Sequence, residues 1–345
     1  MEKKRPILAI SMGDPAGIGP EIIVKALSKP EIYDECRPVV AADYGVMQDA
    51  LRITNSKLTL HKVDRPAEAR FQYGCIDVID MHDVDMSKLE YGKVSAMAGN
   101  AAFESVVKVI ELAMNGEADA TITPPLNKEA MNLAGHHFNG HTEIYATYTN
   151  TKEYSMMLAH DNLRVVHVST HVSLAEACRR VKKDRVLSVI KLADKTCREL
   201  GIAHPGLNPH AGENGMFGRE EIEEITPAIE EAQKLGIDAT GPYPPDSVFS
   251  KARGGGFDIV VAMYHDQGHI PLKVVGFVWD QEKKKWNDVA GVNITLGLPI
   301  IRSSVDHGTA FGKAGKGTAS ELSLINAIHY GVVLANNRQP NEGGN

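Results

Sequence analysis

Cysteine is scarce in this sequence, and the cysteines present lie far apart. Four occur among 345 residues without any C-x-x-C pair, namely Cys36, Cys75, Cys178 and Cys197. This spacing argues against a local zinc cluster or a disulfide framework and predicts free thiols in a reducing compartment. Apolar runs of transmembrane length and a small-residue cleavage site near the N-terminus are also missing. We therefore expect a cytoplasmic protein without a membrane partner.

Clustered positive charge is scarce as well. The chain carries 37 Lys and Arg against 44 Asp and Glu, which gives a formal net charge of -7 at pH 7. Nucleic-acid phosphates are bound by clustered Lys and Arg. The one compact basic run, residues 283–285, lies in a polar segment that is most simply a solvated hairpin tip. We therefore expect no nucleic-acid partner.

Length and pattern predict two lobes of alternating strands and helices. A chain of 345 residues exceeds what a single hydrophobic core usually supports. Strands that alternate with amphipathic helices indicate an α/β protein with a largely parallel sheet. Two further strands, at residues 154–159 and 163–169, predict an antiparallel hairpin. The apolar runs typical of buried strands are residues 7–11, 37–42, 75–80, 118–123 and 259–261.

Helix signals separate these strands. A glycine-rich turn at residues 13–20 precedes a predicted helix, but it matches neither G-x-G-x-x-G nor the Walker pattern. A phosphate cradle and a purely structural turn both remain open for it. Capping boxes at Ser173 and Thr318 predict a long helix that ends at Gly201 and a C-terminal helix to about Asn336.

Cationic, amide and hydroxyl side chains accompany several of the turns. Lys273, Asn293 and Arg302 would suit a small, doubly anionic substrate. His141 and Thr142 open a predicted helix, where free backbone N–H groups also favour an anion. The alternatives are a solvated loop with ordinary surface charges and a simple helix N-cap at Thr142.

Three of the fourteen histidines stand after a predicted strand or in a helix-breaking loop: His171, His210 and His265. If they meet at one edge of a sheet, their imidazoles could bind Zn2+ or a similar divalent ion that acts as a Lewis acid. Their separations of 39 and 55 residues match no local ligand signature. Asp246 and Asp266 could orient the ligands or act as general bases.

Six motifs stand in order along the chain: GDPAGIGPE, TPPLNK, GHTE, GLNPHAGE, AMYHDQG and GVNITLGLPIIRSSVDHGTA. Together they resemble the 4-hydroxythreonine-4-phosphate dehydrogenase family, from about residue 5 to residue 337. The resemblance implies a two-lobed α/β/α fold similar to isocitrate and isopropylmalate dehydrogenases, with the active cleft between the lobes. The implied lobes are residues 1–125 with 295–345, on the cofactor side, and residues 126–294, with the metal ligands and the dimerisation surface.

The resemblance further implies NAD-dependent oxidation of a 4-phosphorylated 3-hydroxy acid to a 3-keto acid that loses CO2. One divalent metal per site (Zn, Mg, Mn or Co) would be bound by His171, His210 and His265, in a homodimer whose partner subunit completes the site. Substrate contacts would fall on His141, Thr142, Lys273, Asn293 and Arg302. The adenosine side of NAD would meet Asp306, His307, Gly308 and Thr309.

Catalytic roles follow from this chemistry. Lys273 would contact the enolate oxygen or reprotonate the enolate, and either Asp246 or Asp266 would take the hydroxyl proton. The sequence leaves the choice between the two carboxylates open.

One segment departs from the vitamin B6 branch of the family. The link between Lys273 and Asn293, residues 274–290, is considerably longer than in that branch. The longer form resembles a paralogous sugar-acid branch, which converts D-threonate or D-erythronate 4-phosphate to dihydroxyacetone phosphate and CO2. We expect the sugar-acid substrate; the alternative is 4-hydroxy-L-threonine 4-phosphate, in pyridoxal phosphate synthesis.

Two other classes of protein could use part of the same residues. A metal-dependent hydrolase or aldolase would use the three histidines and Lys273 without a nucleotide, and thermal protection by NAD would count against it. A non-catalytic sugar-phosphate binding protein would need no metal, so ligand affinity that survives chelation would favour it.

Overall fold

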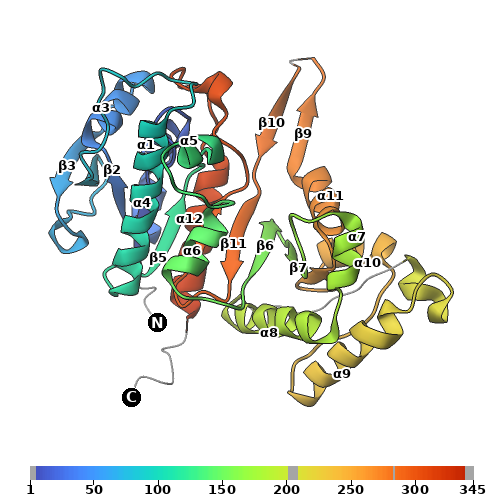
Figure 1. Cartoon of the computed structure of the whole chain (residues 1–345). Helices are drawn as coiled ribbons and strands as arrows, with labels where there is room; N and C mark the ends of the chain where they lie inside the picture. Colours follow the sequence, from blue (N-terminus) through green and yellow to red (C-terminus); the bar gives the residue numbers. More distant parts are fainter. Residues whose placement is uncertain (1–4, 201–208, 283, 339–345) are drawn as a thin grey trace. The chain divides into compact units, whose positions relative to one another are not determined.

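The structure is a computed structural model that describes residues 5–200, 209–282 and 284–338 (Figure 1). The described residues fall into two compact units. Of these residues, the first unit comprises 5–151, 288–292 and 298–336, and the second comprises 152–200, 209–282, 284–287, 293–297 and 337–338.

The first unit contains a sheet of strand order β3-β4-β2-β1-β5-β12. Its pairings are parallel, which confirms the predicted α/β class. The strands are β1 (Ile7–Ser11), β2 (Arg37–Ala42), β3 (Thr59–Val63), β4 (Cys75–Asp80), β5 (Ala120–Thr123) and β12 (Arg302–Val305). The helices are α1 (Gly19–Leu27), α2 (Pro30–Glu35), α3 (Tyr44–Ile53), α4 (Ala96–Met114), α5 (Lys128–Leu133), α6 (His141–Tyr148) and α12 (Leu322–Asn337).

Helices cover both faces of this sheet (Figure 1). Ala9 of β1 packs in one cluster with Val109 of α4. On the opposite face, α12 comes so close that a Cβ at Gly331 would lie 2.8 Å from a side-chain methyl of Ile122. Because both faces are buried, the central strands read as apolar runs, which is why the sequence revealed them.

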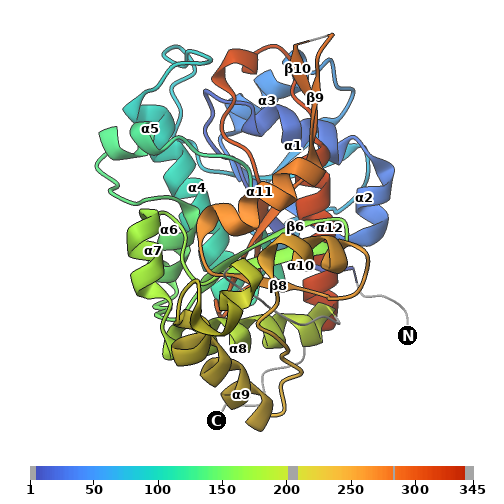
Figure 2. The same cartoon turned by 90° about the vertical axis from the view of Figure 1, so that its right-hand side faces the viewer.

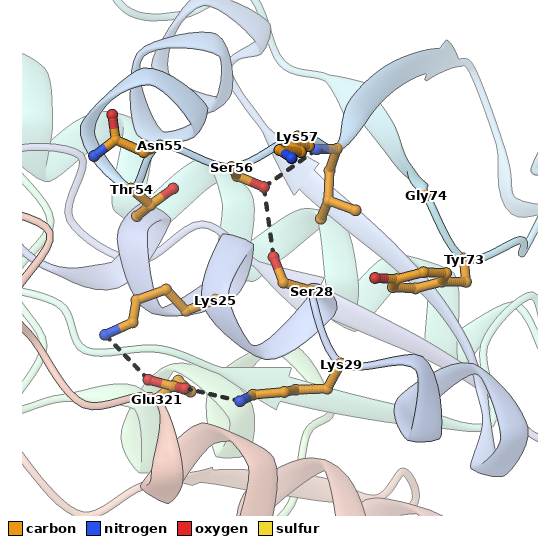
Figure 3. A pocket seen from close by; sticks show the side chains of 11 residues that line it. Lys25, Ser28, Lys29, Thr54, Asn55, Ser56, Lys57, Tyr73, Gly74 and Glu321 are labelled. Carbon is orange, nitrogen blue, oxygen red and sulfur yellow. Dashed lines mark hydrogen bonds and ion pairs between the residues drawn. The ribbon is translucent and has the colours of Figure 1, made fainter.

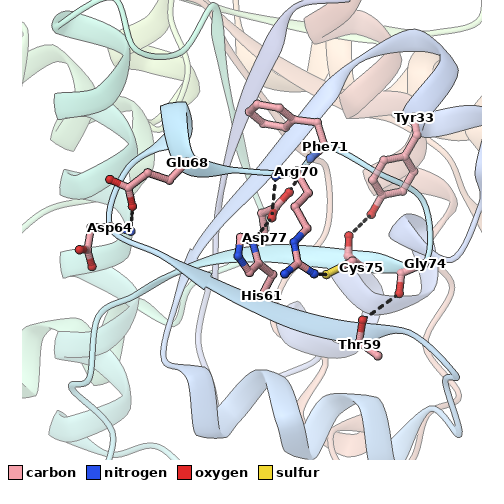
Figure 4. A network of polar contacts seen from close by, with 10 residues as sticks. All are labelled: Tyr33, Thr59, His61, Asp64, Glu68, Arg70, Phe71, Gly74, Cys75 and Asp77. Atoms are coloured by element: carbon pink, nitrogen blue, oxygen red, sulfur yellow. Dashed lines mark hydrogen bonds and ion pairs between the residues drawn. The ribbon is translucent and has the colours of Figure 1, made fainter.

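The edge strand β3 was not predicted, because its sequence TLHKV places two polar residues, His61 and Lys62, side by side and so lacks both a buried apolar run and a clean alternation. It is held beside β4 by Asp77, which is only 1% exposed. The Asp77 carboxylate accepts hydrogen bonds from the backbone N–H groups of Arg70 and Phe71, at 3.1 and 2.8 Å, and from His61 Nδ1, at 2.8 Å (Figure 4). One buried carboxylate thus fixes the loop and the strand at the sheet edge.

The boundary between the units differs from the expected one. Residues 126–151 were expected in the second lobe, but they belong to the first unit. The reason is packing: Met131 of α5 and Tyr145 of α6 lie in one buried cluster with Phe103 and Ile110 of α4. The expected division at residue 125 is therefore wrong.

The second unit has a mixed sheet of order β11-β6-β7-β8. β6 and β7 pair as an antiparallel hairpin, as predicted, and β7 pairs with β8 in parallel. The strands are β6 (Ser155–His160), β7 (Leu163–His167), β8 (Val260–Ala262) and β11 (Val292–Leu296), with β9 (Phe277–Asp280) and β10 (Lys285–Val289) in a separate two-stranded ribbon. The helices are α7 (Leu174–Arg180), α8 (Lys183–Leu200), α9 (Thr226–Lys234), α10 (Pro245–Arg253) and α11 (His265–Gly276), with the shorter helical turns η2 (Pro209–Gly215) and η3 (Glu221–Ile225).

The long helix predicted from Ser173 is two helices. Its start is confirmed, because Ser173 Oγ accepts a hydrogen bond from the backbone N–H of Glu176 at 3.2 Å. The break comes where the Glu224 carboxylate accepts from the backbone N–H of Lys183 at 2.8 Å and so starts α8. A cap from so distant a residue leaves no local signal. The predicted end at Gly201 lies outside the described residues.

The capping box predicted at Thr318 is displaced. The helix α12 begins at Leu322, and the Glu321 side chain pairs instead with Lys25 of α1 and with Lys29, the N-cap residue of α2, at 3.1 and 3.6 Å. Within the described ranges, the helices are too short or too polar to cross a membrane.

Candidate active site

The first unit gathers polar side chains on one face of β5 and β12. Arg302, only 3% exposed, donates from Nε and Nη2 to Thr123 Oγ1, at 3.3 and 3.1 Å, and from Nη1 to Thr142 Oγ1, at 3.4 Å. Its guanidinium carbon also lies 5.4 Å from the centre of the Tyr145 ring. Burial lowers the pKa of Arg302 to about 10, so the group remains cationic at neutral pH. The structure thus fixes a cation between two strands and α6.

The first turn of α6 places hydrogen-bond donors beside this cation. The N-cap is Gly140, with a φ of 140° and no side-chain cap, so the alternative of Thr142 as N-cap is wrong. His141 Nε2 is buried and has no hydrogen-bond partner among the residues described. Burial, with the charges of Arg302 and Lys128, holds the pKa of His141 well below its ordinary value. A neutral imidazole and free helix N–H groups beside a fixed cation suit an anionic group.

The second unit gathers histidines where β7 and β8 end. β8 leads into α11, which packs on β6, β7 and β8 (Figure 2). The rings of His171 and His265 lie 5.7 Å apart, those of His265 and His269 stack at 3.6 Å, and those of His269 and His167 lie 4.8 Å apart. His265, His269 and Lys273 follow one face of α11 at four-residue spacing. Two of the three predicted metal ligands, His171 and His265, therefore meet.

Hydrogen bonds and burial set the tautomers of these rings. His269 Nδ1 donates to the His265 carbonyl at 2.9 Å, and His167 Nδ1 donates to the Met156 carbonyl at 3.2 Å. Burial lowers the pKa of His167 to about 3 and that of His269 to about 4, so both rings are neutral at pH 7. His265 Nδ1 lies 2.7 Å from Asp266 Oδ1, which leaves Nε2 to face a ligand.

His210 lies in η2, in a run of six residues with positive φ that continues to Gly215. Its ring centre is 6.3 Å from that of Phe217. Among the described residues, no group of three His, Cys, Asp or Glu side chains is arranged to hold a metal ion. The three-histidine site stays a prediction, of which one pair is in place.

The remaining predicted residues of the second unit are spread over three elements. Lys273 Nζ lies 5.2 Å from the Phe277 ring. Asn293 of β11 donates to Met156 Sδ at 3.0 Å, and its Oδ1 is buried without a partner in the described part of the chain. Asp246 is exposed in the first turn of α10.

The segment predicted to meet the cofactor, Asp306, His307, Gly308 and Thr309, follows β12 in the first unit. The Asp306 N–H donates to Ser323 Oγ at 3.3 Å, and the Thr309 carbonyl accepts from the Ile18 N–H at 3.1 Å. Burial lowers the pKa of His307, whose Nδ1 donates to the Gly308 carbonyl at 3.0 Å. A Cβ at Gly17 would lie 3.0 Å from the Thr309 Cβ. The loop therefore lies directly against the glycine-rich turn at residues 13–20.

Sequence reasoning missed Asp14 in that turn. Asp14 is fully buried, and its Oδ1 accepts from the Ala16 N–H at 2.8 Å. Its Oδ2 is buried without a partner in the ranges that the structure describes, and burial raises its pKa to about 6. His167 and His269 were missed as well. The four-residue spacing in HDQGH was the signal for His269, but nothing local marked Asp14 or His167.

A cavity of about 560 Å3 lies elsewhere in the first unit, at the last turns of α1 and α3 (Figure 3). No predicted site residue lines it. Its lysines Lys25 and Lys29 pair with Glu321 beside the C-terminal end of α1, where cations also offset the helix dipole. We therefore assign this cavity no part in the chemistry.

The chain is similar to proteins of one family over nearly its whole length. The family model described as "Pyridoxal phosphate biosynthetic protein PdxA" matches residues 34–331. D-threonate 4-phosphate dehydrogenase of Cupriavidus necator is 48% identical over 339 residues, 96% of this chain and 98% of that protein. 4-Hydroxythreonine-4-phosphate dehydrogenase of Desulforapulum autotrophicum is 45% identical over 341 residues, 97% of each chain. The crystal structure of 4-hydroxythreonine-4-phosphate dehydrogenase from Klebsiella pneumoniae has a TM-score of 0.84 at 42% identity and covers 96% of this chain and 99% of that one.

Proposed function

Because this chain belongs to the pyridoxal phosphate biosynthetic protein PdxA family, whose named relatives are dehydrogenases, we propose that it oxidises D-threonate or D-erythronate 4-phosphate with NAD. The product is a 3-keto acid that loses CO2 to give dihydroxyacetone phosphate. At the coarser level, the family makes it an oxidoreductase that acts on a hydroxyl group. The observation that carries the proposal is the buried Arg302 held beside the start of α6.

The anion cluster of the first unit supports a phosphorylated acid as substrate. Arg302 offers a guanidinium that Thr123 and Thr142 already orient, so little side-chain entropy is lost when an anion binds. His141 is neutral and can donate a hydrogen bond to a phosphate oxygen. Contacts to the phosphate, which lies away from the reacting carbon, contribute binding energy that positions a small substrate for hydride transfer.

The histidine cluster of the second unit suits a divalent cation. Two neighbouring imidazoles, one oriented by a carboxylate, form a donor set that fits Zn2+ or a related metal, and His210 is the proposed third ligand. When bound, the metal supplies Lewis-acid chemistry that lowers the pKa of the substrate hydroxyl. Asp246 or Asp266 would take the hydroxyl proton, and NAD, when bound, would serve as the hydride acceptor. After the bond to CO2 breaks, Lys273 donates a proton to the enolate carbon.

The proposal also has to choose between two candidate substrates. Relatives named for D-threonate 4-phosphate and for 4-hydroxythreonine 4-phosphate are both close to half identical to this chain. The long link that separates the two branches forms the β9–β10 ribbon here. Because this chain has the long link, we propose the sugar-acid substrate, with 4-hydroxy-L-threonine 4-phosphate as the alternative.

We also propose that the protein is a homodimer whose second copy completes the metal site. Apolar side chains on α11 and β9 are exposed, which is typical of a surface that a partner covers. They are Ile270, Val274, Val278 and Trp279, with exposed fractions of 59%, 75%, 52% and 48%.

The test is NADH formation by the purified protein with NAD and a divalent metal on the three candidate substrates: D-threonate 4-phosphate, D-erythronate 4-phosphate and 4-hydroxy-L-threonine 4-phosphate. We expect a sugar-acid phosphate to be preferred, with dihydroxyacetone phosphate and CO2 as products. Preference for the amino compound would select the alternative. Absence of NADH with all three would refute the dehydrogenase proposal.

A matched pair of variants tests the anion cluster in the same assay. Arg302→Lys should raise the KM for the phosphorylated acid at least about tenfold, because an ammonium group cannot contact both threonines and the substrate at once. Arg52→Lys is the control, since Arg52 is exposed and pairs only locally with Asp49. Equal kinetics for the two variants would argue against a substrate role for Arg302.

A further inference from the structure

Residues 309–321 of the first unit run along α1 and contact it turn by turn. The Ile18 N–H donates to the Thr309 carbonyl at 3.1 Å. One turn on, the Glu21 carboxylate accepts from the backbone N–H groups of Gly315 and Gly317. Next, Lys25 Nζ donates to the Ala319 carbonyl. Contact positions three and four residues apart form one stripe of the helix.

Glu21 makes the strongest of these contacts. It is only 1% exposed, and it uses one oxygen for each glycine, with Oε1 2.6 Å from Gly315 N and Oε2 2.7 Å from Gly317 N. Hydrogen bonds to a charged group are about twice as strong as neutral ones. A buried carboxylate is costly unless it is satisfied, so the two amides and the carboxylate hold one another in place.

The backbone is shaped for this contact. Gly315 and Gly317 have φ values of 76° and 65°, which favour glycine. A Cβ at Gly317 would lie 2.8 Å from the Ile53 carbonyl oxygen, and a Cβ at Gly315 would lie 3.1 Å from the Tyr91 ring. The packing therefore leaves no room for a side chain at Gly317 and little at Gly315.

The contact of Glu21 with Gly315 and Gly317 also restrains the loop that precedes these glycines. Residues 310–314 are tied at one end by Ile18 and at the other by Glu21. Between these ties, a Cβ at Gly92 would lie 2.8 Å from the Phe311 carbonyl oxygen, and Gly92 itself donates to the Ala16 carbonyl at 2.8 Å. Thr309 is thus held by Ile18, the N-cap residue of α1, and the segment that follows Thr309 is held by Glu21.

We propose that Glu21 is a positioning residue for the dinucleotide: by holding the N–H groups of Gly315 and Gly317, it fixes the loop that starts at Asp306 in the shape that binds NAD. This inference rests on the proposed function, which assigns Asp306, His307, Gly308 and Thr309 to the cofactor. Glu21 itself touches neither substrate nor the reacting atoms.

Glu21→Gln tests the inference, because the amide keeps the shape but can accept from only one of the two glycines. We expect the Kd for NAD, measured by calorimetry on the full chain, and the KM for NAD to rise about tenfold. The kcat and the KM for the phosphorylated acid should change less than about twofold. Glu321→Gln is the control: it removes a carboxylate from the same segment, beyond the glycines, where it pairs with Lys25, and it should leave NAD binding unchanged.

The outcomes separate this inference from the proposed function. If the wild-type protein binds no NAD, the proposed function fails and the role of Glu21 fails with it. If the wild type binds NAD and folded Glu21→Gln binds it equally well, only the role of Glu21 is wrong. Equal losses for NAD and for the phosphorylated acid would show a merely structural role. If Glu21→Gln does not fold, Glu21→Asp replaces it; a smaller but selective loss for NAD supports the inference, and an unselective loss overturns it.

Discussion

Burial sets the charge state of the titratable side chains in both clusters. Arg302 keeps its charge because its ordinary pKa is so high that it stays well above 7 even after burial lowers it. His141, His167 and His269 lose theirs, because burial lowers a pKa that is already near neutrality. The result is a cation beside a neutral imidazole in the first unit, and two neutral imidazoles, His167 and His269, beside the proposed metal pair in the second. Each cluster matches the chemistry that we propose for it.

Asp14 gives a prediction for stability against pH. Its pKa rises from 3.8 in the unfolded chain to about 6 in the folded protein. Between about pH 4 and about pH 6 the folded protein keeps a proton that the unfolded chain releases, so stability falls as the pH rises through this window. Above it, the buried charge costs about 3 kcal/mol. Asp14→Asn should therefore gain stability relative to the wild type when both are moved from about pH 4 to about pH 8.

Thermal unfolding of both proteins at the two pH values checks this prediction. Asp34→Asn, at an exposed position, is the control and should follow the wild type. If Asp14→Asn and the wild type show the same pH dependence, Asp14 is not the group that titrates in this window.

At the scale of the elements, close approach of helices decides where the anion cluster stands. α5 begins at Lys128 and α6 at His141, and both helices pack on α4. The contact between α4 and α5 passes through Gly99, where a Cβ would lie 2.1 Å from the Ala130 carbonyl carbon and oxygen. Backbone atoms cannot give way as a flexible side chain would, so a glycine is required at this crossing.

Gly99→Ala should lower the free energy of unfolding by about 2–4 kcal/mol, because α5 must move off α4. It should also weaken binding of the phosphorylated acid, because α6, which bears His141 and Thr142, shares one buried cluster with α5. Denaturant unfolding and substrate titration measure the two effects. Gly254→Ala is the control, since its φ of -75° is ordinary and its nearest contact would be 3.4 Å away. A Gly99→Ala protein as stable as this control would contradict the packing argument.

At the scale of the whole molecule, the two clusters lie in different compact units, with the proposed phosphate site in one and the proposed metal pair in the other. Neither cluster alone supplies every group that the proposed reaction needs. Among the apolar side chains of α11 and β9, Ile270 lies five residues after the proposed metal ligand His265, and Val274 directly follows Lys273. A second copy seated on them would bring its own residues toward the histidine cluster.

Val274→Asp should convert the proposed homodimer to a monomer, because it places a charge in a surface that the partner covers. Sedimentation at micromolar concentration measures the change, and calorimetry with Zn2+ should show weaker metal binding in the variant. Leu235→Asp, an exposed apolar residue at the end of α9, is the control and should remain a dimer. A monomeric wild type would refute the homodimer.

The sequence by itself determined the α/β class, most of the strands and the family. Buried strands such as β1 and β2 are apolar along most of their length, and the start of α7 carries its own cap at Ser173. These signals are local, because they depend on the conformational preferences of neighbouring residues. The motifs likewise identified Arg302, Thr142, His171 and His265 as site candidates, and the structure brings each pair together.

Only the tertiary structure decided which distant residues meet. It placed residues 126–151 on the first unit, started α8 with the carboxylate of Glu224, and held β3 at the sheet edge through Asp77. It also joined Glu21 to Gly315, across 294 residues of chain. Such contacts form when elements pack side by side and bury a polar group that must then find a partner. No local pattern records that partner, because its identity depends on the packing of the whole unit.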